Sequence, residues 1–205
     1  MGTRDVILDA AAEVMAERGL ANVTTRQIAR AAGFTEAALY KHFPSKADLM
    51  VAVMRERSPD FSPLAGALRG GGSLADALTA VARAAIELYR AGFPMFASVF
   101  ADPATLTTHK EELRQEGAGP HKPNEALAAY LRAEQAAGRV RAGADVRAAA
   151  GLLLGACFQY AFLEHMSEAG FRDDKEAAAS FVRTLLDTLT PTPTPTPPPC
   201  PPPSA

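Results

Sequence analysis

Residues 24–49, TTRQIARAAGFTEAALYKHFPSKADL, contain the start and stop signals of three short helices. The first helix begins after Thr24, because a threonine followed three residues later by Gln27 is the pattern of a capping box. In such a box the threonine hydroxyl accepts a hydrogen bond from the first turn, and the glutamine side chain accepts one from the threonine amide. Gly33 predicts the end of this helix, because glycine adopts a positive φ at a helix C-terminus without steric cost.

Two further helices follow directly on the first. Thr35 is placed to cap the second helix, and Pro44 predicts its end, since the residue before a proline is driven away from helical dihedrals. Ser45 with Asp48 repeats the capping pattern and opens the third helix. Two short helices separated by a tight turn at a glycine are typical of a helix-turn-helix, which lays its second helix in the major groove of DNA.

The motifs in this stretch resemble those of a known family. Residues 24–29 (TTRQIA), 33–35 (GFT) and 39–46 (LYKHFPSK) are similar to the N-terminal DNA-binding domain of TetR-family transcriptional regulators. The resemblance covers about the first quarter of the chain, and the remainder agrees only in length and helical character. It implies a small DNA-binding head on a divergent, helical ligand-binding body.

The whole chain has the pattern of an all-α protein. Alanine is frequent, β-branched runs are scarce, and apolar residues recur at helical spacing, so about nine helices are expected and no strand. Breaks are predicted at the Ser-Pro pairs of residues 58–63 and between Gly92 and Pro94. The predicted units are a helix-turn-helix head (1–46), a ligand-binding and dimerisation body (47–189) and a disordered, proline-rich tail (190–205).

Charge is distributed unevenly along the chain. Residues 18–57 hold seven Lys or Arg against three Asp or Glu, a balance of +4, whereas the whole chain carries −2 and the remainder therefore −6. A basic head on an acidic body is the charge pattern of a nucleic-acid binder.

Several absences set the expected compartment. The N-terminus lacks the apolar region of a secretory signal, and the longest apolar stretch, residues 148–158, is too short to span a bilayer. The two cysteines, Cys157 and Cys200, give no disulfide framework. We therefore expect a cytoplasmic protein without a membrane partner.

DNA contacts are expected from the second short helix and its flanks. Lys41 and Arg26 are the candidates for base contact, because their side chains can donate to guanine, and Ala37 offers only a methyl group. By resemblance, Thr25, Arg26, Tyr40, His42 and Lys46 contact the DNA backbone. The alternative is that these polar residues are ordinary solvated helix faces. The full predicted set is Thr25, Arg26, Thr35, Glu36, Ala37, Tyr40, Lys41, His42 and Lys46.

A ligand cavity is predicted from aromatic residues that recur three and four positions apart, because residues at these spacings share one helix face. Polar residues nearby complete the candidate lining. The alternative is that each aromatic residue is an ordinary core residue. The predicted ligand-binding residues are Tyr89, Phe93, Phe96, Phe100, His109, Tyr130, Glu134, Phe158, Gln159 and Phe162.

A homodimer is expected, because one helix of this kind reads too few bases and a two-fold dimer matches a palindromic site. The resemblance implies an interface built from the last two helices of each subunit. The alternative is that their apolar faces are all internal core. The predicted interface residues are Leu152, Leu153, Ala156, Tyr160, Phe181, Leu185 and Leu189.

Taken together, the resemblance implies a homodimeric repressor that leaves a palindromic, double-stranded operator when a small lipophilic effector binds. Two alternatives stay open, namely an activator with the same DNA head and a redox sensor acting through Cys157. An enzyme is not expected, and neither a cofactor nor a metal, because the four histidines lack the partners of a catalytic or metal-binding motif.

Overall fold

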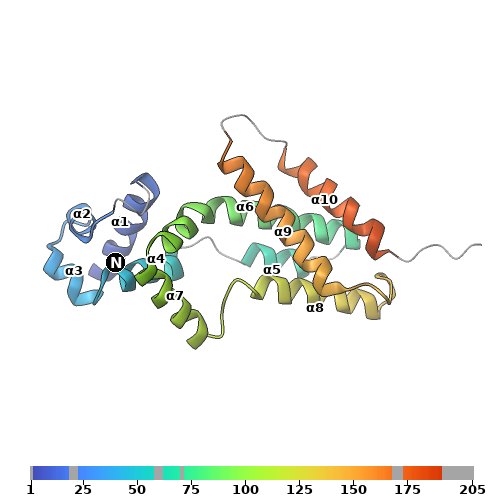
Figure 1. Ribbon diagram of the computed structural model, residues 1–205, viewed down its shortest axis with the longest axis horizontal. Helices are drawn as coiled ribbons and strands as arrows, with labels where there is room; N and C mark the ends of the chain where they lie inside the picture. Colours follow the sequence, from blue (N-terminus) through green and yellow to red (C-terminus); the bar gives the residue numbers. More distant parts are fainter. Residues whose placement is uncertain (1, 19–22, 58–61, 70–71, 168–172, 191–205) are drawn as a thin grey trace, which may run out of the picture.

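The computed structural model describes residues 2–18, 23–57, 62–69, 72–167 and 173–190, and within them the chain forms ten α-helices and no strand. The predicted all-α class is therefore confirmed, whereas the proline-rich tail lies outside the described residues. The helices are α1 (Thr3–Arg18), α2 (Thr25–Ala31), α3 (Glu36–His42), α4 (Lys46–Arg57), α5 (Ser62–Arg69), α6 (Leu74–Ala101), α7 (Pro103–Gln115), α8 (Lys122–Ala136), α9 (Val146–His165) and α10 (Asp174–Leu189). Figure 1 shows α1 to α4 as a head at one end of an elongated molecule, with α5 to α10 as its body.

Head and body each have a hydrophobic core of their own. In the head, fully buried Ile7, Ile28 and Leu39 bring α1, α2 and α3 together, and Leu49 adds α4 to the same cluster. In the body the cluster runs through α5, α6, α8, α9 and α10, and its largest fully buried side chains are Leu78, Ile86, Leu127, Leu131, Leu153 and Leu154. Burying a side chain of this size stabilises a fold by about 1.5–3 kcal/mol, so each cluster is the main support of its own helices.

Helix α6 is one continuous helix, and the predicted break between Gly92 and Pro94 was wrong. The flanking side chains Phe93 and Val99 are buried, and their burial outweighs the low helix propensity of glycine and proline. Gly92 also makes room for Phe96, since a Cβ atom at Gly92 would lie 2.8 Å from that ring. At 1.5 Å per residue the helix is about 42 Å long. Figure 1 shows it curving toward the head, where it contacts α1.

The predicted break at the Ser-Pro pairs was also wrong in part, because α5 begins at Ser62. Pro63 lies in the first turn of this helix, where a proline removes no helical hydrogen bond. Leu64 is buried in the body core, and α5 packs on α6. The first Ser-Pro pair, at residues 58–59, lies outside the described residues.

Helix α9 packs against α6, α8 and α10. Its length and composition would also suit a membrane span, but a core helix of a globular body has the same composition. Asp145 caps its first turn, accepting hydrogen bonds from the amides of Arg147 and Ala148 at 3.0 Å. Because α9 contacts three other helices of the body, it lies at the centre of the body.

Candidate DNA-binding surface and effector-binding body

The turn between α2 and α3 is set by local hydrogen bonds at its two ends. The Gln27 amide donates to the Thr24 hydroxyl at 3.2 Å, and the Thr24 amide donates to the Gln27 side chain at 2.9 Å. Gly33 has a φ of +76°, and the Thr35 hydroxyl accepts from the Ala38 amide at 3.2 Å. These contacts match the predicted capping signals and fix α3 relative to α2.

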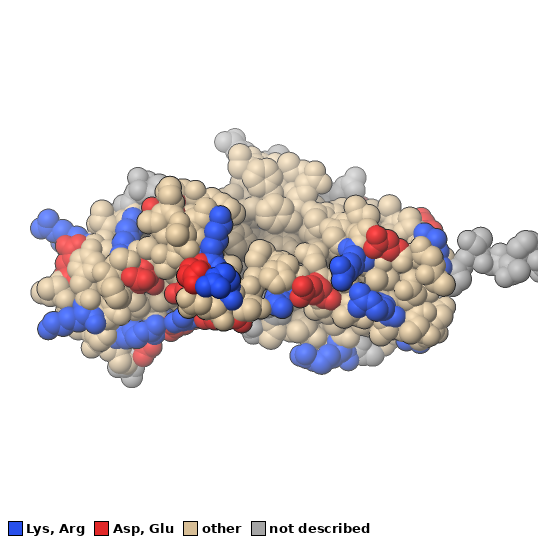
Figure 2. Space-filling view, turned by 60° about the horizontal axis from the view of Figure 1, so that its bottom comes forward, with Lys and Arg blue, Asp and Glu red and all other residues tan. Residues whose placement is uncertain are grey.

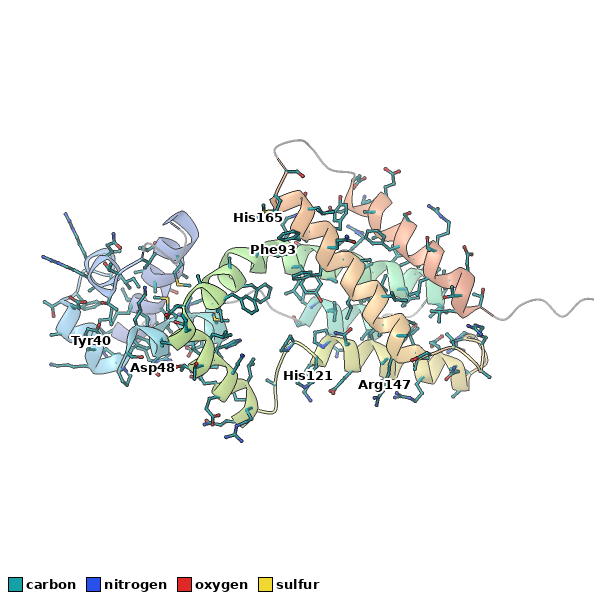
Figure 3. All side chains as sticks on the ribbon, in the orientation of Figure 1. Tyr40, Asp48, Phe93, His121, Arg147 and His165 are labelled. Carbon is teal, nitrogen blue, oxygen red and sulfur yellow. The ribbon has the colours of Figure 1, made fainter. Side chains whose placement is uncertain are left out.

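The outer surface of α2 and α3 carries most of the residues predicted to contact DNA. Arg26, Thr35, Ala37, Lys41 and His42 are exposed, as is Tyr40, whereas Glu36 and Lys46 are half-buried. Figure 3 shows Tyr40 on the head, away from the body. Figure 2 shows basic side chains at the head end of the molecule, with acidic ones among them, and further basic side chains along the body.

A shallow hollow lies between α2 and α3. It is lined by Arg26, Ala29, Arg30, Gly33, Phe34, Thr35 and Glu36. Arg30 was not predicted as a DNA contact, although its position four residues after Arg26 places both guanidinium groups on one face of α2. This spacing is readable from the sequence alone.

Thr25 differs from its neighbours because it is buried, with 7% of its surface exposed. Its hydroxyl donates to Glu36 Oε1 at 2.5 Å and lies 3.3 Å from the hydroxyl of Tyr40. The expected contact of the Thr25 side chain with DNA is therefore corrected: this side chain faces α3 and holds Glu36 and Tyr40 in place.

Ion pairs connect α4 to α1 and to α7. Glu56 accepts two hydrogen bonds from Arg4 of α1, each 2.7 Å long, and one from Arg55 at 2.8 Å. These contacts lower the pKa of Glu56 to about 2. Arg55 also lies 3.7 Å from both Glu112 of α7 and Glu116, the residue that follows this helix. No local sequence pattern pairs α4 with α7, so these contacts are not predictable from the sequence.

Four of the predicted ligand-binding residues meet between α6 and α9. Phe158 contacts both Tyr89 and Phe93, with ring centroids 5.3 and 5.2 Å away. Phe93 also lies 5.8 Å from Phe162 and stacks on His165 at 5.8 Å. Figure 3 shows Phe93 and His165 side by side where the two helices cross. We call these five residues (Tyr89, Phe93, Phe158, Phe162 and His165) the aromatic cluster. His165 was not among the predicted ligand-binding residues, because its contact with α6 arises only when the chain folds.

The other predicted ligand-binding residues lie apart from the aromatic cluster. Phe100 is 73% exposed near the end of α6, and Phe96 packs on Gly92 one turn earlier in its own helix. Glu134 is buried and forms an ion pair with Arg139. The remaining three lie on other helices or faces: His109 on α7, Tyr130 on α8 and the exposed Gln159 on α9. The structure therefore divides the predicted set and does not gather it around one cavity.

Three of these separated residues have a shifted pKa, and the hydrogen bond from Arg139 lowers that of Glu134. Burial lowers the pKa of His109 and raises the pKa of Tyr130. For His109 and Tyr130 burial disfavours the charged form, so these two side chains present neutral groups near pH 7.

The residues predicted for the dimer interface also divide into two groups. Leu152 is 68% exposed, whereas Leu153, Tyr160, Leu185 and Leu189 are buried in the core of the chain itself. This part of the prediction is corrected, because a side chain inside its own subunit has no surface to offer a partner. Ala156 and Phe181 are half-buried.

The exposed face of α9 consists mainly of small and apolar residues. Its members are Ala148, Gly151, Leu152, Gly155, Gln159, Phe162, Leu163 and Met166. We call it the α9 face. A Cβ atom at Gly151 or Gly155 would meet nothing within 4 Å, so neither glycine is required by packing within the chain.

Cys157 lies in the body core, and its thiol is fully buried. Burial raises its pKa to about 12. A thiol of this kind stays protonated at neutral pH and reacts slowly, because the thiolate is the nucleophile. The geometry therefore gives no support to the redox-sensor alternative.

A helix-turn-helix head joined to a larger helical body is the architecture of a DNA-binding regulator. Residues 7–53 match the bacterial regulatory proteins of the tetR family, and residues 76–190 match the C-terminal domain of AefR-like transcriptional repressors. The second match alone covers more than half of the chain, so this protein belongs to the TetR family of transcriptional regulators.

Curated relatives agree with this assignment. The HTH-type transcriptional regulator SrpR of Pseudomonas putida is 43% identical over 65 residues, which are 30% of this chain and 30% of SrpR. Other matches cover 48% of the uncharacterized HTH-type transcriptional regulator TtgW of Pseudomonas putida and 24% of the nucleoid occlusion factor SlmA of Aliivibrio fischeri. This chain therefore spans less than half the length of these three relatives. A longer match, 27% identical over 157 residues, covers 73% of this chain and 76% of the fatty acid metabolism regulator protein of Bacillus subtilis.

Solved structures show the same fold. A TetR-family transcriptional regulator from Mesorhizobium loti matches with a TM-score of 0.69 at 17% identity, covering 92% of this chain and 96% of that one. FadR of Bacillus subtilis, in complex with stearoyl-CoA, matches with a TM-score of 0.66 at 21% identity and covers 89% and 97% of the two chains.

Proposed function

We propose that this regulator is a cytoplasmic, homodimeric repressor whose head binds a palindromic operator and whose body binds a lipophilic effector that releases the DNA. The observation that carries the proposal is the outward-facing α3, held by caps at the turn and flanked by basic side chains of α2 and α4. Phosphate contacts from such groups supply most of the affinity for DNA, and side chains at base edges supply the specificity.

The head can be tested with DNA from upstream of the regulator's own gene. In fluorescence anisotropy at fixed, near-physiological salt, we expect tight binding to this fragment and weak binding to a scrambled duplex. Tyr40→Phe and Lys46→Ala remove one phosphate-contacting group each and should both weaken binding. Lys175→Ala removes an exposed charge from α10 and should leave binding unchanged. Equal affinity for both duplexes, or equal effects of all three variants, would count against the proposal.

The α9 face supports the dimer part of the proposal. Monomeric proteins rarely expose contiguous apolar surface of this kind, and Gly151 and Gly155 allow a partner helix to approach closely. We expect Leu152→Glu to give a monomer in light scattering and to weaken operator binding, since a monomer reads one half-site. The matched control is Ala126→Glu, on an exposed position of α8. A dimeric Leu152→Glu would place the interface elsewhere.

The aromatic cluster supports a lipophilic effector. Its residues join α6 to α9, so an apolar chain that separates these two helices would find aromatic surface on both sides. The named relatives include a fatty acid metabolism regulator and a FadR solved with stearoyl-CoA, and a long-chain acyl group is the effector class we propose here.

Release by an acyl ligand gives a direct test. Titration of stearoyl-CoA into the protein–DNA complex should lower the anisotropy, and Phe93→Ala should require more ligand. Phe100→Ala is the matched control, because it makes the same substitution on the same helix at an exposed position. Release that is equally efficient in both variants would argue against the aromatic cluster as the binding site.

Coupling between effector and operator follows from the contacts of α4. This helix contributes Leu49, Met50 and Val53 to the head core and contacts α7 of the body. A nearly complete switch requires the effector to bind the released state about 10⁴-fold more tightly than the DNA-bound state. An activator would use the same head, and a reporter gene under the operator distinguishes the two: loss of the protein raises expression if it is a repressor.

A further inference from the structure

Glu36 is the one acidic residue between positions 23 and 46, where the other charged residues are Arg26, Arg30, Lys41 and Lys46. It occupies the first position of α3 and lines the hollow between α2 and α3. With α3 in the major groove, as proposed above, this carboxylate meets a duplex whose phosphates repel it. A base that donates a hydrogen bond to the carboxylate offsets that repulsion.

The carboxylate is held in a defined position by its neighbours. The Thr25 hydroxyl donates to Glu36 Oε1 at 2.5 Å. A threonine hydroxyl has a single hydrogen, so Tyr40 must be the donor in its 3.3 Å contact with the Thr25 oxygen. Oε2 has no partner among the described residues, and Glu36 is half-buried, which limits its rotation. One oxygen is thus anchored to α2 while the other is free to accept.

Building on the operator binding proposed above, we propose that Glu36 is a specificity-determining residue that accepts a hydrogen bond from the exocyclic amino group of a cytosine in each half-site. The N-terminal residues of a recognition helix are those that reach base edges. An ionised carboxylate only accepts, so it selects bases that present an amino group in the major groove, namely cytosine and adenine. Adenine presents its N7 acceptor beside the amino group, which repels a carboxylate, and cytosine is therefore favoured.

Selection from a randomised duplex library, with sequencing of the bound fraction, tests this assignment on the full chain. The wild type should favour cytosine about tenfold at one position of each half-site. Glu36→Gln should change that preference to adenine, because an amide can pair with both the amino group and N7 of adenine. Glu36→Ala should lose the preference at this position and keep it at the others. Glu87→Gln, an exposed acid on α6, is the control and should select the wild-type sequence.

A second pair of variants tests the anchor. Thr25→Val removes the hydroxyl with little change of shape and should reduce the cytosine preference to about threefold, whereas Thr25→Ser should retain it. A Glu36→Ala protein that selects the same sequence as the wild type at every position would overturn the inference. A wild-type protein that enriches no sequence would overturn the proposed operator binding itself, so the two failures are distinguishable.

Discussion

The carboxylate of Glu56 joins two arginines, and replacing it with glutamine should destabilise the chain at neutral pH. Arg4 and Arg55 both donate to it and hold its pKa near 2, well below the ordinary value of 4.5. A lowered acid pKa stabilises the folded chain at pH values above 4.5, and this contribution is lost as the pH falls from 4.5 toward 2. The ionised Glu56 carboxylate therefore stabilises the folded chain at neutral pH, and this stabilisation is lost only in acid.

The size of the effect follows from the pKa and from the exposure of the groups. A change from 4.5 to about 2 corresponds to at most about 3 kcal/mol of unfolding free energy. The Glu56 side chain is 26% exposed, and those of Arg4 and Arg55 are 38% and 46% exposed, so solvent screens the attraction. Exposed pairs contribute roughly 0.2–1 kcal/mol each, and the expected loss in Glu56→Gln is therefore about 1 kcal/mol.

Urea unfolding at pH 7 and pH 3 measures this contribution. Protein concentration is kept the same throughout, because dimerisation would change apparent stability. Glu56→Gln should be less stable than the wild type at pH 7, and the difference should shrink at pH 3. Glu87→Gln, on an exposed position of α6, should stay within about 0.5 kcal/mol of the wild type. A deficit of the same size at both pH values, or none at pH 7, would refute the reasoning.

Three further predictions concern the helix links and the buried thiol. In a Cys200→Ser background, Cys157 should react with iodoacetamide at pH 8 at least tenfold more slowly in the folded chain than in urea, because burial raises its pKa to about 12; equal rates would contradict its burial. Ser73→Ala should lower the unfolding free energy by about 1 kcal/mol, since the Ser73 hydroxyl accepts from the Asp76 amide at the start of α6; an unchanged urea midpoint would contradict this role. A double-mutant cycle of Arg55→Gln and Glu112→Gln should give a coupling energy of about 0.5 kcal/mol, and strictly additive effects would show that the 3.7 Å pair does not join head and body.

The head could be predicted from the sequence because its boundaries are set by neighbours along the chain. Thr24, Gln27, Gly33 and Thr35 act within one turn of themselves, so the caps and the positive φ are readable without knowledge of the fold. The same local reasoning failed at Pro94, where packing of α6 on α9 overrides propensity. Local signals therefore locate a helix end only where no tertiary burial opposes them.

The candidate sites in the body were harder to predict because they depend on which face of a helix points inward. Helix α9 is apolar on nearly all sides, so its sequence does not distinguish Leu152 from Leu153, although the first is exposed and the second is core. Phe96 and Phe100 share a face by spacing, yet only the part of α6 that lies under α9 places its rings in the aromatic cluster. Helical spacing identifies a face, and only the packing of other helices decides what that face contacts.

Among the residues that the structure describes, the two hydrophobic cores share no buried side chain. Amide hydrogens exchange through local openings whose free energies differ between units of a structure. The head core draws on four helices of 7 to 16 residues, whereas the body core includes the two longest helices of the described chain, α6 and α9. We therefore expect amide hydrogens of the head to exchange faster than those of the body core, through openings of the head that leave the body folded.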